Sequence, residues 1–311
     1  MAKFSTGDLG LLLVYGLCRV LPMRWVSAFG AWRGRYRGDT RAELEARVCQ
    51  NLTEIAPELA PEAVSEVLTA LRRESGRAAL EVLISDRIVK AKRIRWLEHP
   101  GLNVALEQNR SVVFALVHVC NLGDVLGGDI LDRFDHFRTR EVVVRTIQSP
   151  VMRWIVKRCR ARLLRDLPGL IQAPHAGQAR RALTELQNPP AMLMLHVDEA
   201  RGRQVAFPMF GASEGDGRVR DAKGTNAAYA VRFARKASAY LVPVVMQRSD
   251  SDPLSFEARV LEAWDMACEA KSDDQVLAQM SGAFEAIILQ NPAQWLNLYH
   301  RRPTPQQNLS S

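Results

Sequence analysis

Cysteine is scarce in this chain, with five residues among 311. The five are far apart, and none belongs to a C-x-x-C pattern: Cys18, Cys49, Cys120, Cys159 and Cys268. A disulfide framework or a zinc site of the usual spacing is therefore not expected, and the scatter fits a reducing compartment.

The sequence also lacks nucleotide-binding signatures. It has no Walker loop, no Rossmann glycine fingerprint, no zinc finger and no RNA-recognition motif. Its Gly-rich segment, GASEGDGRVRDAKG at residues 211–224, has no strand and helix around it, so we interpret it as a mobile surface loop or lid. Internal repeats and long Gly/Ser linkers are missing as well, which favours a single domain.

A long hydrophobic run is missing from the N-terminal region. The apolar segment LGLLLVYGLCRV at residues 9–20 contains Arg19 and ends before Pro22. It is too short to cross a bilayer core of about 30 Å, which needs roughly 20 apolar residues. No small-residue cleavage site follows it, and the basic residues come after it, so a signal peptide is not expected.

Two interpretations of this segment remain open. A helix that dips into one leaflet would place aromatic side chains at the level of the lipid headgroups and arginines against anionic lipid. The other interpretation is a buried first helix of a soluble domain. The residues in question are Trp25, Trp32 and Tyr36 among the aromatics and Arg24, Arg33, Arg35 and Arg37 among the arginines.

Acidic residues are outnumbered by basic ones, 34 to 42, and the net charge is +8. Nucleic acid, anionic lipid and an acidic carrier protein would all be attracted, although a modest excess of arginine can also serve solubility alone. The densest basic segment, RWIVKRCRARLLRDLP, has Arg153, Lys157, Arg160 and Arg162 at near-helical spacing. Arginine suits phosphate because its planar fork contacts two oxygens at once.

Hydrophobic periodicity indicates an α/β domain. Residues 39–95 have helical spacing, and after Gly101 short Val- and Leu-rich runs alternate with amphipathic helices. This alternation predicts a largely parallel central sheet flanked by helices. The predicted strands are 111–118, 140–146, 191–198, 240–246 and 255–263; the predicted helices are 121–133, 150–165, 176–188, 223–238 and 273–302.

Polar residues follow two of the predicted strands. His118 ends one of them and precedes Asn121 and Asp124, and Asp198 ends another. Ligands bind beyond the carboxyl ends of parallel strands, and a carboxylate near an imidazole can orient it as a base. A histidine with an aspartate nearby is also common by chance, and Asp198 could equally belong to a salt-bridged loop.

Several segments, in this order, resemble the late acyltransferase family of lipid A biosynthesis. They begin with the short apolar helix and RVCQNL, continue with His118 and with VVVRTIQSPVMRWI, which contains Arg145, and then include VDEARGRQVAFPMFG and ARKASAYLVPVV. WLNLYHRRP, which contains Arg301 and Arg302, comes last. The resemblance extends over nearly the whole chain. It implies a membrane-associating region at 1–38 and an acyltransferase domain at 39–302. The polar composition after Pro303 predicts a flexible tail at 303–311.

The resemblance implies transfer of an acyl chain from acyl carrier protein or CoA to a hydroxyl of a lipid A precursor or another anionic bacterial lipid. His118 would remove the hydroxyl proton, without a cofactor, a metal or a covalent intermediate. The remaining implied site residues bind substrate: Asn121, Arg145, Asp198, Arg301 and Arg302. A monomer on the cytoplasmic face of the bacterial inner membrane is expected, with acyl carrier protein and anionic lipid, and not nucleic acid, as partners.

One position departs from the family pattern. In that pattern, four residues separate the histidine from an acidic residue. That position is Gly123 here, and Asp124 comes one residue later. We expect Asp124 to reach His118 through a longer loop, although such a shift turns a side chain by about 100° around a helix. The alternatives are a slower enzyme, orientation by Asp198, a binder of acyl lipid or carrier without turnover, or another acceptor such as an aryl polyene, ornithine lipid or glycolipid.

Overall fold

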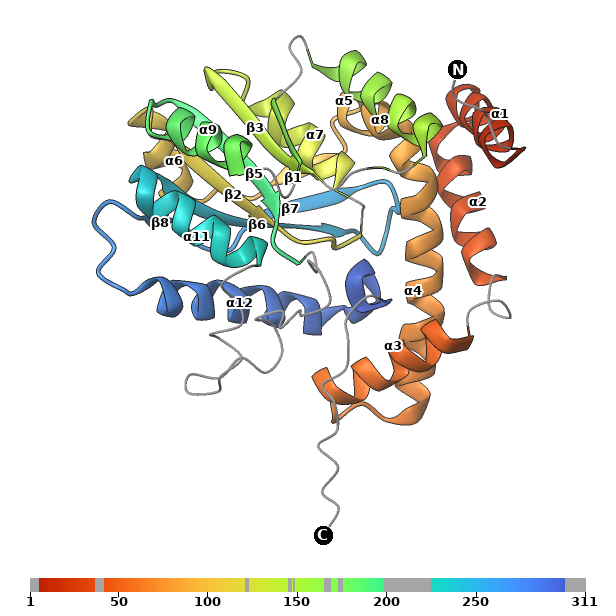
Figure 1. Ribbon diagram of the computed structural model, residues 1–311. Helices are drawn as coiled ribbons and strands as arrows, with labels where there is room; N and C mark the ends of the chain where they lie inside the picture. The colour runs from red at the N-terminus through yellow and green to blue at the C-terminus, as the bar shows by residue number, and fades with distance from the viewer. Residues whose placement is uncertain are drawn as a thin grey trace.

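The computed structural model describes residues 6–36, 42–120, 123–144, 147, 149–164, 169–172, 176–198 and 225–299. An eight-stranded sheet runs through its centre, in the order β1-β7-β6-β2-β5-β3-β4, with β8 paired to β6 (Figure 1). The strands are β1 Ile94–Trp96, β2 Val112–Leu116, β3 Thr139–Val144, β4 Gly169–Gln172, β5 Ala191–His196, β6 Tyr240–Arg248, β7 Phe256–Val260 and β8 Trp264–Asp265.

The middle of the sheet is parallel, as predicted. β2 pairs in parallel with β5 and β6, and β3 pairs in parallel with β4 and β5. Every residue of β2 is buried, which is why the strand is a continuous apolar run and not an alternating one. The prediction was incomplete at one edge, because β7 and β8 are antiparallel to β6.

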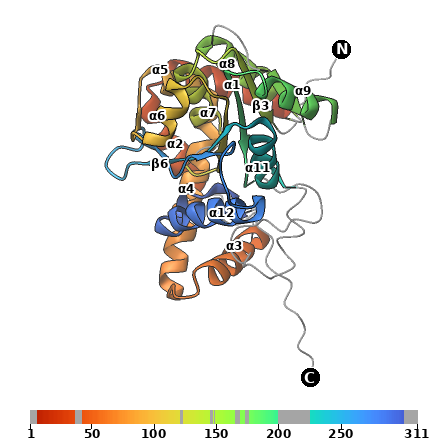
Figure 2. The same cartoon turned by 90° about the vertical axis from the view of Figure 1, so that its left-hand side faces the viewer.

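Helices cover both faces of the sheet (Figures 1 and 2). On one face lie α9 Ala176–Leu186 and α11 Asn226–Ala237, and on the other lie α6 Pro100–Glu107 and α7 Asp124–Arg133. Next to α7 is α8 Pro150–Leu163. The four predicted helices between the strands are therefore confirmed, with boundaries that differ by a few residues.

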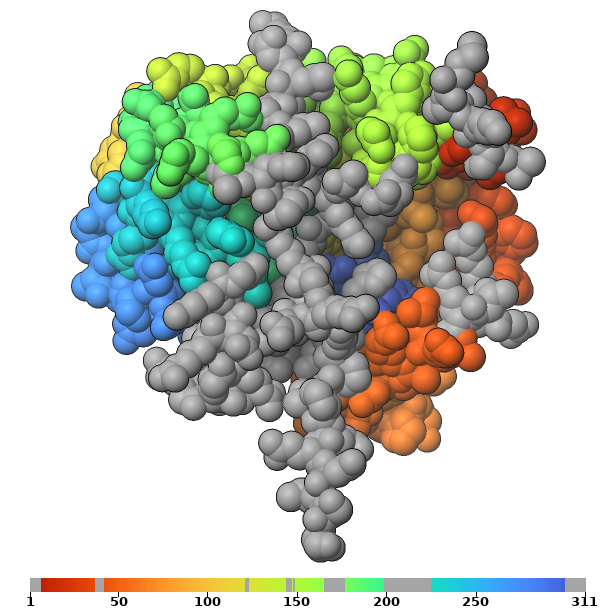
Figure 3. Space-filling model, viewed as in Figure 1, coloured from red at the N-terminus to blue at the C-terminus, as the bar shows by residue number. Residues whose placement is uncertain are grey.

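A helical layer precedes the sheet. It consists of α1 Thr6–Val20, α2 Met23–Arg35, α3 Ala42–Ile55, α4 Pro61–Glu81, the 3-10 turn η2 Val82–Ile84 and α5 Ser85–Lys90. In the space-filling view, α1, α2 and α3 form one side of the molecule, and α9 and α11 form the other (Figure 3). Among the described helices, none has the length and apolar content needed to cross a membrane.

The last described segment differs from the long helix that we predicted. α12 Asp273–Gln290 ends before Pro292, and two 3-10 turns follow, η4 Pro292–Gln294 and η5 Leu296–Tyr299. A proline disfavours helical backbone in the residue before it, and Asn291 indeed has φ −151° and ψ 77°. The break turns η4 and η5 back toward the end of β2, where Val119 bridges to Trp295.

Candidate active site

The sheet register brings His118 and Asp198 together. Leu116 pairs with His196 at the carboxyl ends of β2 and β5, so the residues two positions further on are level with each other. The chain order also reverses here, because β6 lies on one side of β2 and the strands β5, β3 and β4 lie on the other. Such a point in an α/β sheet is where ligands characteristically bind.

Asp198 contacts both the side chain and the backbone of His118. One carboxylate oxygen is 2.6 Å from His118 Nδ1, and the other accepts a hydrogen bond from the His118 backbone N–H at 2.8 Å. The Asp198 side chain has no exposed surface, whereas 12% of the His118 side chain is exposed. A carboxylate at Nδ1 favours the tautomer with its proton on Nδ1, which places the basic lone pair on Nε2.

The 3-10 segment after α12 completes the surroundings of Asp198. Trp295 Nε1 donates a hydrogen bond to the carboxylate at 3.0 Å, and Asn297 Nδ2 donates one to the backbone carbonyl of Asp198 at 2.8 Å. Burial by itself would raise the pKa of Asp198, but the charge and hydrogen bonds of His118 outweigh it and lower that pKa. Asp198 therefore stays an anion that can orient His118.

Buried hydrogen bonds fix the segment that carries His118. Its carbonyl accepts a hydrogen bond from Leu296 N at 2.9 Å, and the Cys120 N–H donates to Gln294 O at 2.6 Å. The buried Arg248 side chain, which is ion-paired with Glu81, also donates to Cys120 O at 3.1 Å. The backbone on which the imidazole sits is therefore held from two sides.

A second imidazole lies against the first. The rings of His118 and His196 have centroids 4.1 Å apart and planes inclined by 27°, which is a stacked arrangement. A Cβ atom on Gly123 would lie 2.4 Å from Cε1 and 2.6 Å from Nε2 of His196. Gly123 also has φ +90°, a conformation that residues with a side chain disfavour. Both the close approach of His196 and the backbone conformation therefore favour glycine at this position.

We predicted that Asp124 orients His118, but in the structure it is Asp198 that contacts His118 Nδ1. Asp124 is the first residue of α7, and its carboxylate pairs with Arg160 of α8 at 2.9 Å. The N-cap position before it belongs to Gly123, so the one-residue shift directs the carboxylate toward α8. Asp198 holds the position beside His118, as the alternative of orientation by Asp198 expected, and its side chain is fully buried there.

Four predicted substrate-binding residues lie outside the described residues: Asn121, Arg145, Arg301 and Arg302. Conversely, the sequence did not single out His196, Trp295 or Asn297 as site residues. A signal for Trp295 and Asn297 was present, because both belong to the WLNLYHRRP segment that resembles the family.

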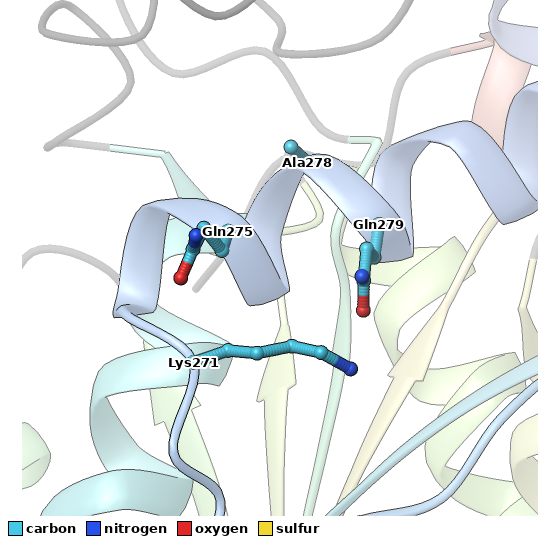
Figure 4. Close-up of a pocket in the computed structure, with 4 residues that line it drawn as sticks. All are labelled: Lys271, Gln275, Ala278 and Gln279. Atoms are coloured by element: carbon cyan, nitrogen blue, oxygen red, sulfur yellow. The ribbon is translucent and has the colours of Figure 1, made fainter.

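Two further features bear on ligands. In the described part of the chain, no group of three or more His, Cys, Asp or Glu side chains is arranged to hold a metal ion. A cavity of about 390 Å³ lies beside α12, lined by Lys271, Gln275, Ala278 and Gln279 (Figure 4). Its lining residues are distinct from those that contact His118 and Asp198, so we do not assign it to the candidate active site.

The arrangement can carry out general base catalysis. An imidazole that is oriented by a buried carboxylate can accept the proton of a hydroxyl through Nε2, and the carboxylate stabilises the imidazolium that forms. Such a pair activates an oxygen nucleophile without forming a covalent bond between enzyme and substrate.

Comparisons with known proteins give a family. The sequence model of the bacterial lipid A biosynthesis acyltransferases matches residues 8–302. Among solved structures, the 1-acyl-sn-glycerophosphate (LPA) acyltransferase PlsC from Thermotoga maritima is similar, with 9% identity and a TM-score of 0.39 over 93% of this chain and 97% of that chain. A comparison with curated protein sequences finds no match. The match of the sequence model over nearly the whole chain shows that this enzyme belongs to the bacterial lipid A biosynthesis acyltransferase family.

Proposed function

We propose that the enzyme transfers a fatty acyl chain from a thioester carrier to a hydroxyl of an anionic bacterial lipid, with His118 as the general base. His118 Nε2 takes the hydroxyl proton as the oxygen attacks the thioester carbon. The new carbon–oxygen bond forms, the carbon–sulfur bond breaks, and the proton passes from the imidazolium to the departing thiolate. The default acceptor is the hydroxyl of an acyl chain on a lipid A precursor.

The observation that carries this proposal is the 2.6 Å contact between His118 Nδ1 and Asp198 at the carboxyl edge of the sheet. A buried carboxylate on the far side of an imidazole turns its Nε2 into a directed base. General base catalysis of this kind accelerates a reaction by roughly 10²- to 10⁴-fold.

The test is transfer of labelled acyl chain from acyl carrier protein to extracted bacterial lipids in detergent, with wild type and His118→Ala. His136→Ala is the matched control, because His136 is exposed on the loop after α7. We expect wild type and the control to transfer label and His118→Ala to lose at least about 10²-fold of the rate. The wild type could instead bind carrier and lipid but show no more turnover than His118→Ala. That result would favour the alternative, a family member that binds without catalysis.

The same assay identifies the acceptor. Lipid A precursor, ornithine lipid, aryl polyene and glycolipid fractions are offered separately, and CoA thioesters are compared with carrier thioesters. The fraction that takes up label in a His118-dependent manner is the acceptor. Labelling confined to a fraction other than the lipid A precursor would replace the default acceptor while the chemistry stays the same.

We also propose that α1 and α2 bind the cytoplasmic face of the inner membrane without crossing it. Large apolar side chains recur at helical spacing on the exposed side of both helices, while Tyr15 and Cys18 on the opposite side of α1 are buried. The exposed set is Leu9, Leu13, Leu17, Val20, Trp25, Phe29, Trp32 and Tyr36, between 52% and 78% exposed. Aromatics and leucines beside exposed arginines are the composition of an interfacial helix.

Sedimentation with anionic liposomes tests this membrane proposal. Leu13→Glu and Trp32→Glu each place a charge on the exposed apolar side, and Val104→Glu on α6 is the control at a partly exposed apolar position outside it. We expect both α1/α2 variants to lose at least about tenfold in partitioning, because each loses apolar contact and gains repulsion. Equal partitioning of all four proteins would contradict the proposal.

An acidic carrier protein would bind the exposed basic side of α8. Arg153, Lys157 and Arg158 are exposed there, whereas Arg160 is paired with Asp124 and Arg162 donates to the Tyr15 hydroxyl. We expect Lys157→Glu to raise the KM for carrier thioester at low salt and to leave the KM for the CoA thioester much less affected. Equal increases in the KM for both donors would contradict the proposal that the carrier protein binds α8.

A further inference from the structure

Small residues at the start of α7 leave space for the ring of His196. The side chains of Met194 and His196 are two positions apart on β5 and therefore point to the same face of the sheet. Gly127, one turn after Gly123, lies against Met194, with an added Cβ 2.9 Å from the Met194 methyl carbon. The two glycines thus let the start of α7 approach β5 closely enough to cover both side chains.

The position of His196 is fixed from its backbone as well. Its carbonyl accepts a hydrogen bond from Nδ2 of Asn226, a buried residue at the start of α11, at 2.7 Å. In the part of the chain that the structure describes, the His196 Nε2 atom is buried with no hydrogen-bond partner. A buried polar atom without a hydrogen bond does not stabilise the fold, so a flat apolar ring could replace the imidazole here without losing a hydrogen bond of Nε2.

The stacked geometry points to a role of the ring. Asp198 at 2.6 Å and Asn297 Nδ2 at 3.2 Å both contact the His118 ring at Nδ1, and contacts at one edge do not by themselves fix the plane of an imidazole. His196 closes off one face of the ring at a centroid distance of 4.1 Å. Together, an edge contact and a face contact define both the direction of Nε2 and the plane of the ring.

We propose that His196 is a positioning residue for His118, whose ring it holds flat in the direction set by Asp198. The proposal rests on the proposed function of His118 as the general base. Alignment of a base with the proton that it removes matters strongly, and small misplacements lower the rate without weakening substrate binding.

The charge state of His196 is consistent with this role. Its burial, and then the neighbouring His118, lower the pKa of His196 to about 3, although Asp198 acts in the opposite direction and Arg160 of α8 adds to the lowering. A neutral His196 leaves the imidazolium that forms at His118 without a second positive charge stacked on it. The ring therefore stays in contact throughout the reaction.

The test compares His196→Phe with His196→Ala in the acyl-transfer assay. Phenylalanine keeps a flat ring without nitrogen atoms, whereas alanine removes the face contact. We expect His196→Phe to keep kcat within about threefold and His196→Ala to lose at least about tenfold in kcat with little change in KM. Wild-type kcat in His196→Ala would overturn the proposal, and an equal loss in both variants would assign the effect to the nitrogen atoms instead.

A readout without turnover separates this proposal from the proposed function. The proton NMR signal of His118 Nδ1–H reports the hydrogen bond to Asp198 directly. We expect a sharp signal in wild type and His196→Phe and a broadened or missing one in His196→Ala, whose fold is checked by circular dichroism. Absence of acyl transfer with this NMR pattern would refute the function and keep the positioning, whereas an unchanged signal in a folded His196→Ala would refute the positioning.

Discussion

Two carboxylates lie near the carboxyl edge of the sheet, and their surroundings differ. Asp198 follows β5, is fully buried, and contacts the imidazole and backbone of His118. Asp124 begins α7 and pairs with Arg160, and both of these side chains retain some exposure. The nearness of a carboxylate to a histidine in the chain is therefore a poor guide to which one serves it, because strand register decides the contact.

The largest effect that distinguishes the two carboxylates is expected from Asp198→Asn. The new amide would donate to His118 Nδ1 and stabilise the tautomer with the proton on Nε2, so the base would be lost. We expect kcat for acyl transfer to fall by roughly 10³-fold or more, with the KM for lipid little changed. A kcat within a few-fold of wild type would show that Asp198 does not orient the base.

A smaller effect is expected from Trp295→Phe. The substitution keeps an aromatic ring but removes the indole N–H that donates to the Asp198 carboxylate at 3.0 Å. A hydrogen bond to a charged group contributes about 1.5–3 kcal/mol, so we expect a loss of at least about tenfold in kcat. Trp264→Phe is the control, since Trp264 is a buried tryptophan of β8 at the β6 edge. Equal losses in the two variants would mean that packing, and not the donor, matters.

The pH dependence of stability tests the protonation state of His196, which lies beside the same site. The pKa of His196 is lowered from 6.5 to about 3, so between these values the unfolded chain binds a proton that the folded chain does not. Stability is therefore lost as the pH falls below about 6.5, by up to about 1.4 kcal/mol per pH unit from this group. We expect urea unfolding to show a shallower loss in His196→Phe between pH 6.5 and 4. Identical slopes would mean that His196 is protonated in the folded protein.

The smallest effect is expected from Asp124→Asn. Its partner Arg160 is partly exposed and can be hydrated, so the free energy of unfolding should fall by about 1 kcal/mol. We expect kcat to stay within about threefold of wild type, since no described contact links Asp124 to His118. Arg160→Gln serves as the partner control and should give a similar, small loss of stability. A large loss of turnover in Asp124→Asn alone would return Asp124 to the active site.

The sequence predicted the scaffold better than the contacts. Apolar runs ending in His118 and in Asp198 predicted two strands, which end two residues earlier in the structure, and alternation with helices predicted the largely parallel sheet to which both belong. It did not reveal which carboxylate meets the histidine, because strand order and register are tertiary properties. The position of Gly123 shows the difficulty: it suggested a shifted pair, and it instead makes room for the His196 ring.

Residues that come from distant parts of the chain were the hardest to predict. Asn297 lies 179 residues after His118 in the sequence, and it reaches the site because the chain breaks at Pro292 and turns back. His196 ends a strand that is otherwise uniformly apolar, so its role follows from a ring stacked across two strands and not from a motif. Such partners become visible only when the fold is known.

The most direct test of the account is the proton NMR signal of the His118 Nδ1–H group in wild type, Asp198→Asn and Asp124→Asn. A hydrogen bond to a buried carboxylate shifts this proton far downfield, and the assay needs no knowledge of the acceptor lipid. We predict that wild type and Asp124→Asn show the signal and that Asp198→Asn lacks it. A signal that survives in Asp198→Asn and disappears in Asp124→Asn would contradict the account.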